Sequence, residues 1–552
     1  MQMLELIKRE SVGERRRIIL AATVSGVANA FVLGVINAAA QHVEEGLNFR
    51  YFLMFLSSMA LYIYCLKYTQ DRGVALFEGI ISKITIRLSH KIKDAELSIM
   101  EEIGRALIYN RLTQETEVIS DSQQILVNAL QSFVVLIFAS AYIYTISPAS
   151  FFLILAMHSG TVMYYLYREK ETNHLIQQAT AKWVELIEKI LYLLDGFKQI
   201  KMRKRLGDEL TADIEIISNQ VYEHKISVAR LQNSNNILAA SISAMILGAI
   251  VFILPRFIPT HHEVISELIA SILFIFGPLS YIVIAVPTLE KANIAALNIA
   301  TLEEQLDKKQ KELYLPASVQ SGSRFASFRK IELRGIEFSY RGKDGEELFH
   351  LGPLNLEIER GKILFIVGGN GTGKSTVLKL LTGLYQMDRG TILIDDVPLG
   401  RGDIQEYREL FSIIFADFYL FEKLYGLDPV SRETVLDILK DMELQGKTDY
   451  DGERFTNLNL STGQRKRIAL LVAILEKRPI FIFDEWAADQ DPHFRKHFYN
   501  SILPDLRRQG KTIIAVTHDD HYFEIPNRIV KMDYGIIESD REIEETPPPA
   551  TP

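Results

Sequence analysis

Long apolar segments alternate with charged stretches through the first half of the chain. A helix needs about 20 apolar residues to cross the roughly 30 Å hydrocarbon core of a bilayer. Six segments meet or approach this length, at residues 18–41, 51–68, 125–146, 151–167, 237–257 and 264–287. The pattern therefore predicts an all-α transmembrane domain of six helices.

The connections between these segments alternate in length. Residues 42–50, 147–150 and 258–263 form short connections, whereas residues 69–124 and 168–236 form long ones. The long connections carry apolar residues at helical spacing, and unstructured loops of this length are uncommon in compact domains. We therefore expect the long connections to be helix extensions that all project from the same side of the membrane.

Basic residues indicate which side this is. Lys8, Arg9 and Arg15–Arg17 precede the first segment, and the long connections are rich in Lys and Arg, while the short ones carry little beyond Arg50 and Arg256. Cytoplasmic loops of membrane proteins hold an excess of Lys and Arg. The N-terminus, the long connections and the C-terminal half are therefore predicted to be cytoplasmic.

The predicted spans carry almost no ionisable side chains. His158 is the main exception. A transporter driven by protons usually has carboxylates or histidines within the membrane, so energy is expected to enter elsewhere. We expect His158 to be a hydrogen-bonded packing residue, with a cavity-lining role as the alternative.

The first motif of the second half is a strand followed by a glycine-rich loop and an amphipathic helix. The strand covers residues 363–367. The loop carries Gly368, Gly369, Asn370, Gly371, Thr372, Gly373, Lys374, Ser375 and Thr376. This is the P-loop pattern in its required setting, in which backbone N–H groups and the helix N-terminus hold phosphates. Lys374 is expected to contact the β- and γ-phosphates of ATP, and Ser375 to ligate Mg²⁺.

A second apolar strand, residues 480–483, ends in two acids, Asp484 and Glu485. Such a run fits a buried strand of a parallel sheet. After a P-loop, the first acid is expected to ligate Mg²⁺ through water, and the second to act as the general base on the attacking water. The two motifs predict an α/β P-loop ATPase domain with ATP and Mg²⁺ as cofactors.

Charge and cysteine content exclude other classes. The net charge is −8, and residues 1–320 contribute only −1 of it, from 30 Lys and Arg against 31 Asp and Glu. Neither half has the basic excess of a nucleic-acid-binding protein. The one cysteine, Cys65, rules out an intrachain disulfide framework and a multi-cysteine metal site.

The segment between the two motifs carries a further pattern. It reads Leu460-Ser461-Thr462-Gly463-Gln464 and resembles the L-S-G-G-Q signature of ABC-transporter ATPases, with Thr462 in place of the first glycine. The resemblance covers the whole chain, because six spans followed by one ATPase domain is the order of an exporter-type half-transporter. It implies that Ser461 and Gly463 contact the γ-phosphate of an ATP molecule held by a partner subunit, with Gln464 in the same nucleotide site.

Other residues match landmarks of this family. Tyr340 matches the aromatic residue that stacks on adenine, Asp491 the D-loop aspartate, and His518 the switch histidine that senses the γ-phosphate. The resemblance thus implies Glu485, His518 and Lys374 as the catalytic residues.

One landmark is missing. The family's Q-loop glutamine is absent, since that stretch reads Phe415-Ala416-Asp417-Phe418. Either Asp417 takes over its role, or the membrane domain and the ATPase domain are coupled through other residues.

The loops at residues 484–492 and 518–523 resemble those of the bacterial cyclic-peptide exporter family, which includes exporters of microcins, lipopeptides and siderophore precursors. This resemblance implies ATP-driven export of a cyclic peptide, microcin or siderophore-like molecule across the bacterial cytoplasmic membrane by alternating access. It also implies a homodimer joined through the membrane and ATPase domains, although a heterodimer stays open. The alternatives are an importer or lipid flippase of the same fold, and an ATP-gated sensor that does not transport.

The predicted domains follow from these features. They are a transmembrane domain at residues 1–320, an ABC nucleotide-binding domain at residues 321–543 and a disordered tail at residues 544–552. The boundary is placed where a charged helix at residues 290–315 gives way to Pro316, Ser321 and Gly322.

Overall fold

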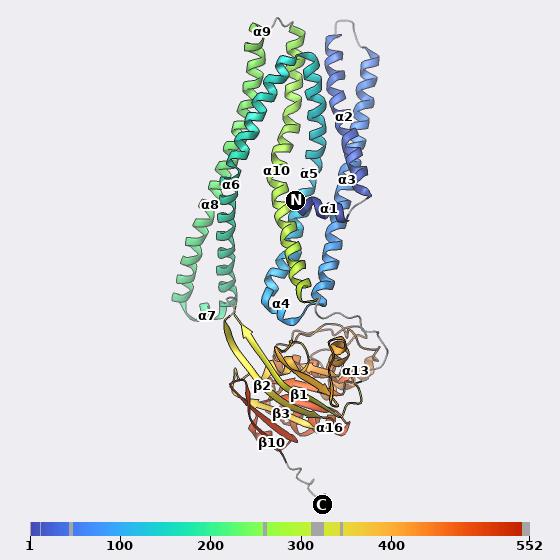
Figure 1. Ribbon diagram of the computed structural model, residues 1–552, viewed down its shortest axis with the longest axis vertical. Coiled ribbons are helices and arrows are strands. Elements are labelled where there is room, and N and C mark those ends of the chain that lie inside the picture. Colours follow the sequence, from blue (N-terminus) through green and yellow to red (C-terminus); the bar gives the residue numbers. More distant parts are fainter. Residues whose placement is uncertain are drawn as a thin grey trace, which may run out of the picture. The chain divides into compact units, whose positions relative to one another are not determined.

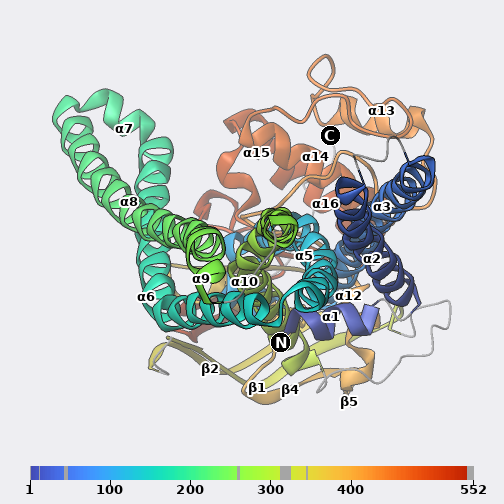
Figure 2. The same cartoon turned by 90° about the horizontal axis from the view of Figure 1, so that it is seen from above.

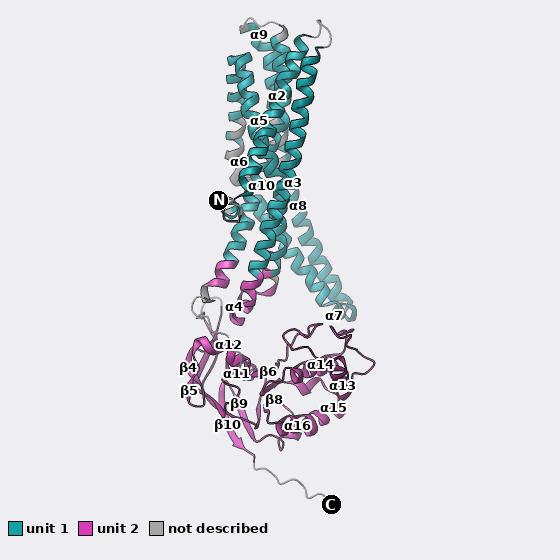
Figure 3. Ribbon diagram, turned by 90° about the vertical axis from the view of Figure 1, so that its right-hand side faces the viewer, with its two compact units in different colours: residues 1–88, 109–302 teal, residues 89–108, 303–552 magenta. Residues whose placement is uncertain are grey.

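The computed structural model describes residues 2–10, 13–42, 48–257, 262–310, 325–342 and 346–543. The chain forms two compact units, shown in different colours in Figure 3. We call the first the helical unit, which is Met1–Leu88 with Tyr109–Leu302. We call the second the α/β unit, which is Ser89–Ile108 with Glu303–Pro552.

Long helices make up the helical unit (Figure 1). In chain order the helices that contribute to it are α1 (Gln2–Glu10), α2 (Glu14–Gln41), α3 (Phe49–Lys93), α5 (Arg105–Ile146), α6 (Pro148–Asp195), α7 (Phe197–Met202), α8 (Lys204–Gly248), the π-helical turn η2 (Ala249–Ile253), α9 (Leu254–Phe257) and α10 (His262–Gln310). Figure 2 shows α6 and α8 side by side, joined by α7. The prediction of a helical domain with long helix extensions is confirmed.

Four of these helices have stretches long and apolar enough to cross a membrane, by length and composition. They lie at Glu14–Gln41, Phe49–Lys93, Leu107–Ile146 and Val264–Asp307, with shorter apolar helices at Pro148–Gly160 and Ala240–Arg256. All six predicted spans overlap these segments, and their limits stay a prediction.

Polar side chains inside the helical unit pair with one another. Gln131 of α5 donates to the hydroxyl of Ser25 on α2 at 3.0 Å, and both are buried. Gly26 lets these two helices approach, because a Cβ there would lie 2.8 Å from the side chain of Val134. A small residue beside a polar pair is typical of helix packing in membranes, where apolar contact alone gives little driving force.

The α/β unit holds two sheets. The first is antiparallel, in the order β2 (Glu347–Glu359), β1 (Lys330–Arg341), β4 (Arg389–Ile394) and β5 (Val397–Pro398). The second has the order β10 (Ile536–Glu542), β9 (Arg528–Asp533), β3 (Ile363–Gly368), β8 (Thr512–Val516), β7 (Ile480–Asp484) and β6 (Phe411–Ile414). From β9 to β6 every pairing in the second sheet is parallel.

Both faces of the second sheet are covered. Leu364 and Ile366 of β3 enter one buried cluster, and Ile363 and Phe365 enter the other. Successive side chains of a strand point to opposite faces, so a continuous apolar run fits a strand that is buried on both sides. The short helices of this unit are α4 (Leu97–Ile103), α11 (Lys374–Leu381), α12 (Ile404–Arg408), α13 (Arg432–Asp441), α14 (Thr462–Leu475), α15 (Pro492–His497) and α16 (Leu503–Arg508).

Helix α4 comes from the first half of the sequence but belongs to the α/β unit. Leu97 packs against the buried cluster that contains Leu364 and Ile366. The sequence predicts residues 1–320 together as the transmembrane domain, and this stays a prediction, while by contacts residues 89–108 group with the α/β unit. The boundary at residue 320 stays a prediction, and both that boundary and the tail at residues 544–552 lie outside the described residues.

Candidate functional site

Three candidate motifs follow three neighbouring strands. The P-loop follows β3, Asp484 ends β7, and His518 comes two residues after β8. These strands pair in the order β3, β8, β7 and run parallel, so their carboxyl ends meet at one edge of the sheet. Ligand sites of open parallel sheets lie at this edge. The sheet therefore gathers residues that are more than 100 positions apart in the sequence.

Lys374 lies within the P-loop and is only 6% exposed. Its ammonium group donates to the carbonyl oxygens of Gly368 at 3.1 Å and Gly369 at 2.7 Å. Burial lowers the pKa of Lys374, and the carboxylates of Glu485 and Asp484 oppose that shift. The loop thus holds a partly desolvated cation whose hydrogen bonds a phosphate could take over.

Gly368 starts the turn of this loop. Its φ is +150°, and a Cβ at this position would lie 2.3 Å from the carbonyl oxygen of Met532 on the adjacent strand. No side chain fits there without displacing backbone. The strand therefore needs glycine at the point where the P-loop begins.

Asp484 faces the start of α11 and is 3% exposed. The hydroxyl of Ser375 donates to its carboxylate at 3.4 Å. Burial raises the pKa of Asp484, and hydrogen bonds from Ser375 and from the backbone N–H of Ala416 pull it back down. A serine hydroxyl beside a buried carboxylate is a donor set that suits Mg²⁺, which prefers oxygen ligands. Ser375 and Asp484 could thus hold the metal, as predicted from the sequence.

Glu485 and His518 meet at the same edge. Their Oε1 and Nε2 atoms lie 3.3 Å apart. Glu485 has a left-handed backbone with φ of +50°, and its N–H donates to the carbonyl of Val516 at 3.1 Å. A non-glycine residue in this region is costly and often marks a functional site. The carboxylate and the imidazole thus form a pair that could take a proton from water and orient it.

Lys466 holds the loop of Glu485 and was not among the predicted residues. It is 2% exposed, donates to the backbone carbonyl of Glu485 at 2.7 Å, and pairs with Asp489 at 2.7 Å. The indole of Trp486 donates to the carbonyl of Lys466 at 2.9 Å. These bonds tie the helix of the signature to the strand that carries the candidate base.

Ser461 begins helix α14 as its N-cap. Its hydroxyl accepts the N–H of Gln464, whose side chain accepts the N–H of Ser461 in return, so the two form a capping box. Gln490 donates to the carbonyl of Gly463 at 3.0 Å. In the described part of the chain, no hydrogen bond joins the signature to the P-loop. The signature therefore forms a second group, separate from the P-loop group.

Asp491 lies with this second group. It caps α15 by accepting the N–H of Phe494 at 2.9 Å, and it pairs with the buried Arg467. The hydrogen bond from Phe494 and the charge of Arg467 hold the pKa of Asp491 below its usual range. The aspartate is thus ionised and firmly placed at the start of α15.

Tyr340 of β1 lies on the P-loop side. Its hydroxyl is 3.4 Å from the hydroxyl of Thr376 and 3.3 Å from that of Tyr385. The ring lies beside the first turn of α11, where the base of a nucleotide could stack on it. The structure therefore brings Tyr340 to the P-loop through Thr376.

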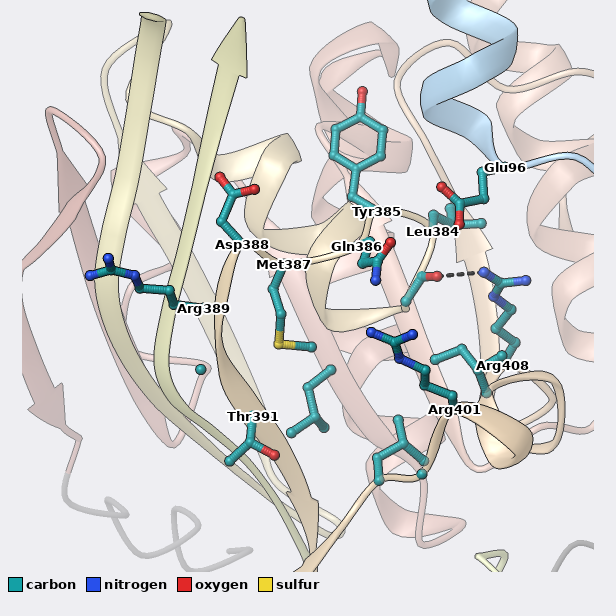
Figure 4. Close-up of a pocket in the computed structure, with 16 residues that line it drawn as sticks. Glu96, Leu384, Tyr385, Gln386, Met387, Asp388, Arg389, Thr391, Arg401 and Arg408 are labelled. Carbon is teal, nitrogen blue, oxygen red and sulfur yellow. Dashed lines mark hydrogen bonds between the residues drawn. The ribbon is translucent and has the colours of Figure 1, made fainter. Parts of the chain in front are cut away.

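A pocket of about 290 Å³ lies between α4 and residues 383–408 (Figure 4). The Arg408 guanidinium donates to the carbonyl of Gly383 at its edge. Burial lowers the pKa of Arg408, and the nearby carboxylate of Glu96 on α4 opposes this shift. Opposite charges at Arg408 and at Glu96, the N-cap of α4, thus accompany the apolar contact of α4 with the rest of the α/β unit.

Comparisons with known proteins agree with these features. The family model described as ABC transporter matches residues 351–488. The ATP-binding protein SyrD of Pseudomonas syringae pv. syringae is 30% identical over 539 residues, which is 95% of this chain and 93% of SyrD. The subtilin transport ATP-binding protein SpaT of Bacillus subtilis is 22% identical over 84% of this chain and 80% of its own length.

A solved structure has the same fold. It is that of a bacterial Atm1-family ABC exporter with ATP bound, which matches with a TM-score of 0.72 at 18% identity. The match covers 97% of this chain and 95% of that one. The fold therefore extends over both halves of the molecule.

Replacing the candidate base tests this site. We expect Glu485→Gln to slow ATP hydrolysis about 10²- to 10⁴-fold, the range for loss of a general base, while ATP still binds. Both measurements use the chain in liposomes. Phosphate release measures hydrolysis, and a fluorescent ATP analogue measures binding. Glu538→Gln, an exposed acid on β10 that pairs with Lys531, is the control and should leave both unchanged. Hydrolysis that survives Glu485→Gln would show that another group is the base.

Proposed function

Because this chain belongs to the ABC transporters and is an exporter that hydrolyses ATP, we propose that it exports a cyclic peptide, microcin or siderophore-like molecule. The observation that carries the proposal is the match to SyrD along nearly the full length of both chains. The name of SpaT, a subtilin transport protein, supports the same class of cargo. The loops at residues 484–492 and 518–523 support it further through their resemblance to cyclic-peptide exporters.

The proposed catalytic roles are consistent with the geometry of the site. ATP would bind with its phosphates on the P-loop and its adenine on Tyr340, and Ser375 and Asp484, the latter through water, would hold Mg²⁺. Mg²⁺ bound there would supply positive charge against the phosphate oxygens. Glu485 accepts the proton of the attacking water, and His518, 3.3 Å away, fixes the direction of the carboxylate and contacts the γ-phosphate.

The working unit is proposed to be a homodimer. In the part of the chain that the structure describes, the signature residues 460–464 make no hydrogen bond to the P-loop of the same chain. In a symmetric pair, each ATP lies between the P-loop of one copy and Ser461, Gly463, Gln464 and Asp491 of the other. ATP binding then closes two identical sites at once, and hydrolysis opens them.

An open, apolar hollow of about 1190 Å³ on the surface of the helical unit is compatible with contact to an apolar part of a cargo. Helices α5, α6 and α10 line it with Phe133, Tyr144, Phe151 and Leu279, among other apolar side chains. His158 also lines this hollow, which is compatible with the alternative that it faces a cavity, and both roles stay predictions. Apolar walls with one imidazole and a few hydroxyl groups suit a molecule that combines apolar side chains with hydrogen-bonding groups.

We also propose a location. The spans would lie in the bacterial inner membrane, and the excess of Lys and Arg supports a cytoplasmic N-terminus and ATPase domain. A lipid flippase is the second candidate, because the ATP-dependent lipid A-core flippase of Wigglesworthia glossinidia brevipalpis is 23% identical over 80% of this chain.

Cross-linking tests the proposed dimer. Cys65 is the one cysteine, so Cys65→Ala gives a background without thiols. Gly369→Cys and Ser461→Cys are then added together, and Gly369 has room, since a Cβ there meets only Thr372 at 3.7 Å. With ATP bound, oxidation should give a product of twice the chain mass on a gel. Chains with either cysteine alone should stay single, and a disulfide formed within one chain would contradict the dimer.

Transport into inside-out vesicles tests direction and cargo. The vesicles receive labelled cyclic peptides, a siderophore-like chelator or a labelled lipid, with ATP outside. We expect ATP-dependent accumulation of a peptide or chelator in the lumen, and none in vesicles that carry Glu485→Gln. Preferential movement of the lipid would favour the flippase. ATP hydrolysis stimulated by a cargo that never enters would indicate a sensor.

A further inference from the structure

Tyr385 lies between the candidate adenine residue and helix α4. The hydroxyl of Tyr340 donates to that of Tyr385 at 3.3 Å, and the hydroxyl of Tyr385 donates to Glu101 of α4. The ring of Phe338 stacks on Tyr385 with centroids 5.1 Å apart. Tyr385 is 3% exposed, so a change at one end of this chain of hydrogen bonds is not relieved by water.

A second set of contacts reaches the same carboxylate from the P-loop helix. Helix α11 carries Lys374 and Thr376 in its first turn and Lys379 near its end. Lys379 donates to Glu101 at 2.9 Å and to the hydroxyl of Tyr385 at 3.1 Å. Glu101 therefore receives hydrogen bonds both from the helix that binds phosphate and from the tyrosine next to Tyr340.

At the Asp484 end of the site, the glutamine side chain that the family has in its Q-loop is missing. Ala416 stands where the family has its Q-loop glutamine, and only its backbone N–H reaches Asp484. The neighbouring Asp417 is exposed. In the described residues, no side-chain hydrogen bond links Ala416 or Asp417 to α4.

We propose that Tyr385 is a positioning residue that transmits adenine binding at Tyr340 to helix α4 through Glu101. This rests on the proposed function, because it assumes that α4, which follows α3 and precedes α5 in the chain, carries the effect of ATP to the predicted spans. Stacking of the base fixes the ring of Tyr340 and so strengthens its bond to Tyr385. The ordered hydroxyl of Tyr385 then holds Glu101, together with Lys379.

Hydrogen exchange of α4 in the full chain, held in lipid nanodiscs, tests this inference. The non-hydrolysable analogue AMP-PNP is compared with imidotriphosphate, which has the same phosphates and no nucleoside, each at a concentration that protects the P-loop peptide. We expect AMP-PNP to slow exchange in the peptide around residues 97–103 roughly tenfold more than imidotriphosphate, the size of effect of one hydrogen bond to a charged group. Tyr385→Phe keeps the ring on Phe338 and should abolish this difference.

Tyr407→Phe is the matched control. The hydroxyl of Tyr407 is also buried and donates to the carbonyl of Leu381 on α11 at 2.6 Å, but it contacts neither Tyr340 nor Glu101 in the described structure. The control should keep the difference between the two ligands. If Tyr385→Phe does not fold, Glu101→Gln on the exposed side of the same link takes its place.

Two results would overturn the inference. One is equal protection of α4 by AMP-PNP in Tyr385→Phe and in the unaltered chain. The other is equal protection of α4 by both ligands in the unaltered chain. Either result leaves the proposed export function standing, because that function is tested separately by transport of peptide, chelator or lipid into inside-out vesicles.

Discussion

The parallel pairing of β3, β8 and β7 is the constraint on which the rest of the site depends. It brings the P-loop, Asp484 and His518 to one edge, although more than 140 residues separate the first from the last. Each strand is buried on both faces, so its register is fixed by packing and not by the ligand. The carboxylates at this edge are therefore positioned before ATP arrives, which is what electrostatic catalysis requires.

Much of this site could be predicted because its signals are local. A P-loop needs glycines, a lysine and a serine at fixed spacing after a strand, and the segment 363–376 supplies all of them. Tyr340, Asp491 and His518 carry no such local signal, and only the resemblance to a family pointed to them. The long helices beyond the spans could also be predicted, since helical spacing of apolar residues continues through the long connections.

The supporting contacts could not be predicted, because they join distant positions without a motif. In the sequence, Lys466 is one of several basic residues that follow the signature. Only the fold shows that it is buried and bonded to the backbone of Glu485. Likewise, Glu101 and Tyr385 are 284 residues apart, and neither segment carries a sequence motif that predicts their hydrogen bond. The assignment of α4 to the α/β unit depends on the same kind of contact, through Leu97. His158 has packing and cavity lining as its two predicted roles, and the hollow that it lines depends on how three helices meet.

We propose that this chain is half of an ATP-driven exporter whose two nucleotide sites are shared between copies. Native mass spectrometry of the Glu485→Gln chain, released from detergent with ATP and Mg²⁺ bound, measures this directly. The predicted result is a complex of two chains with two ATP molecules, and no ATP on single chains. Single chains that retain ATP and Mg²⁺ as fully as pairs do would contradict it.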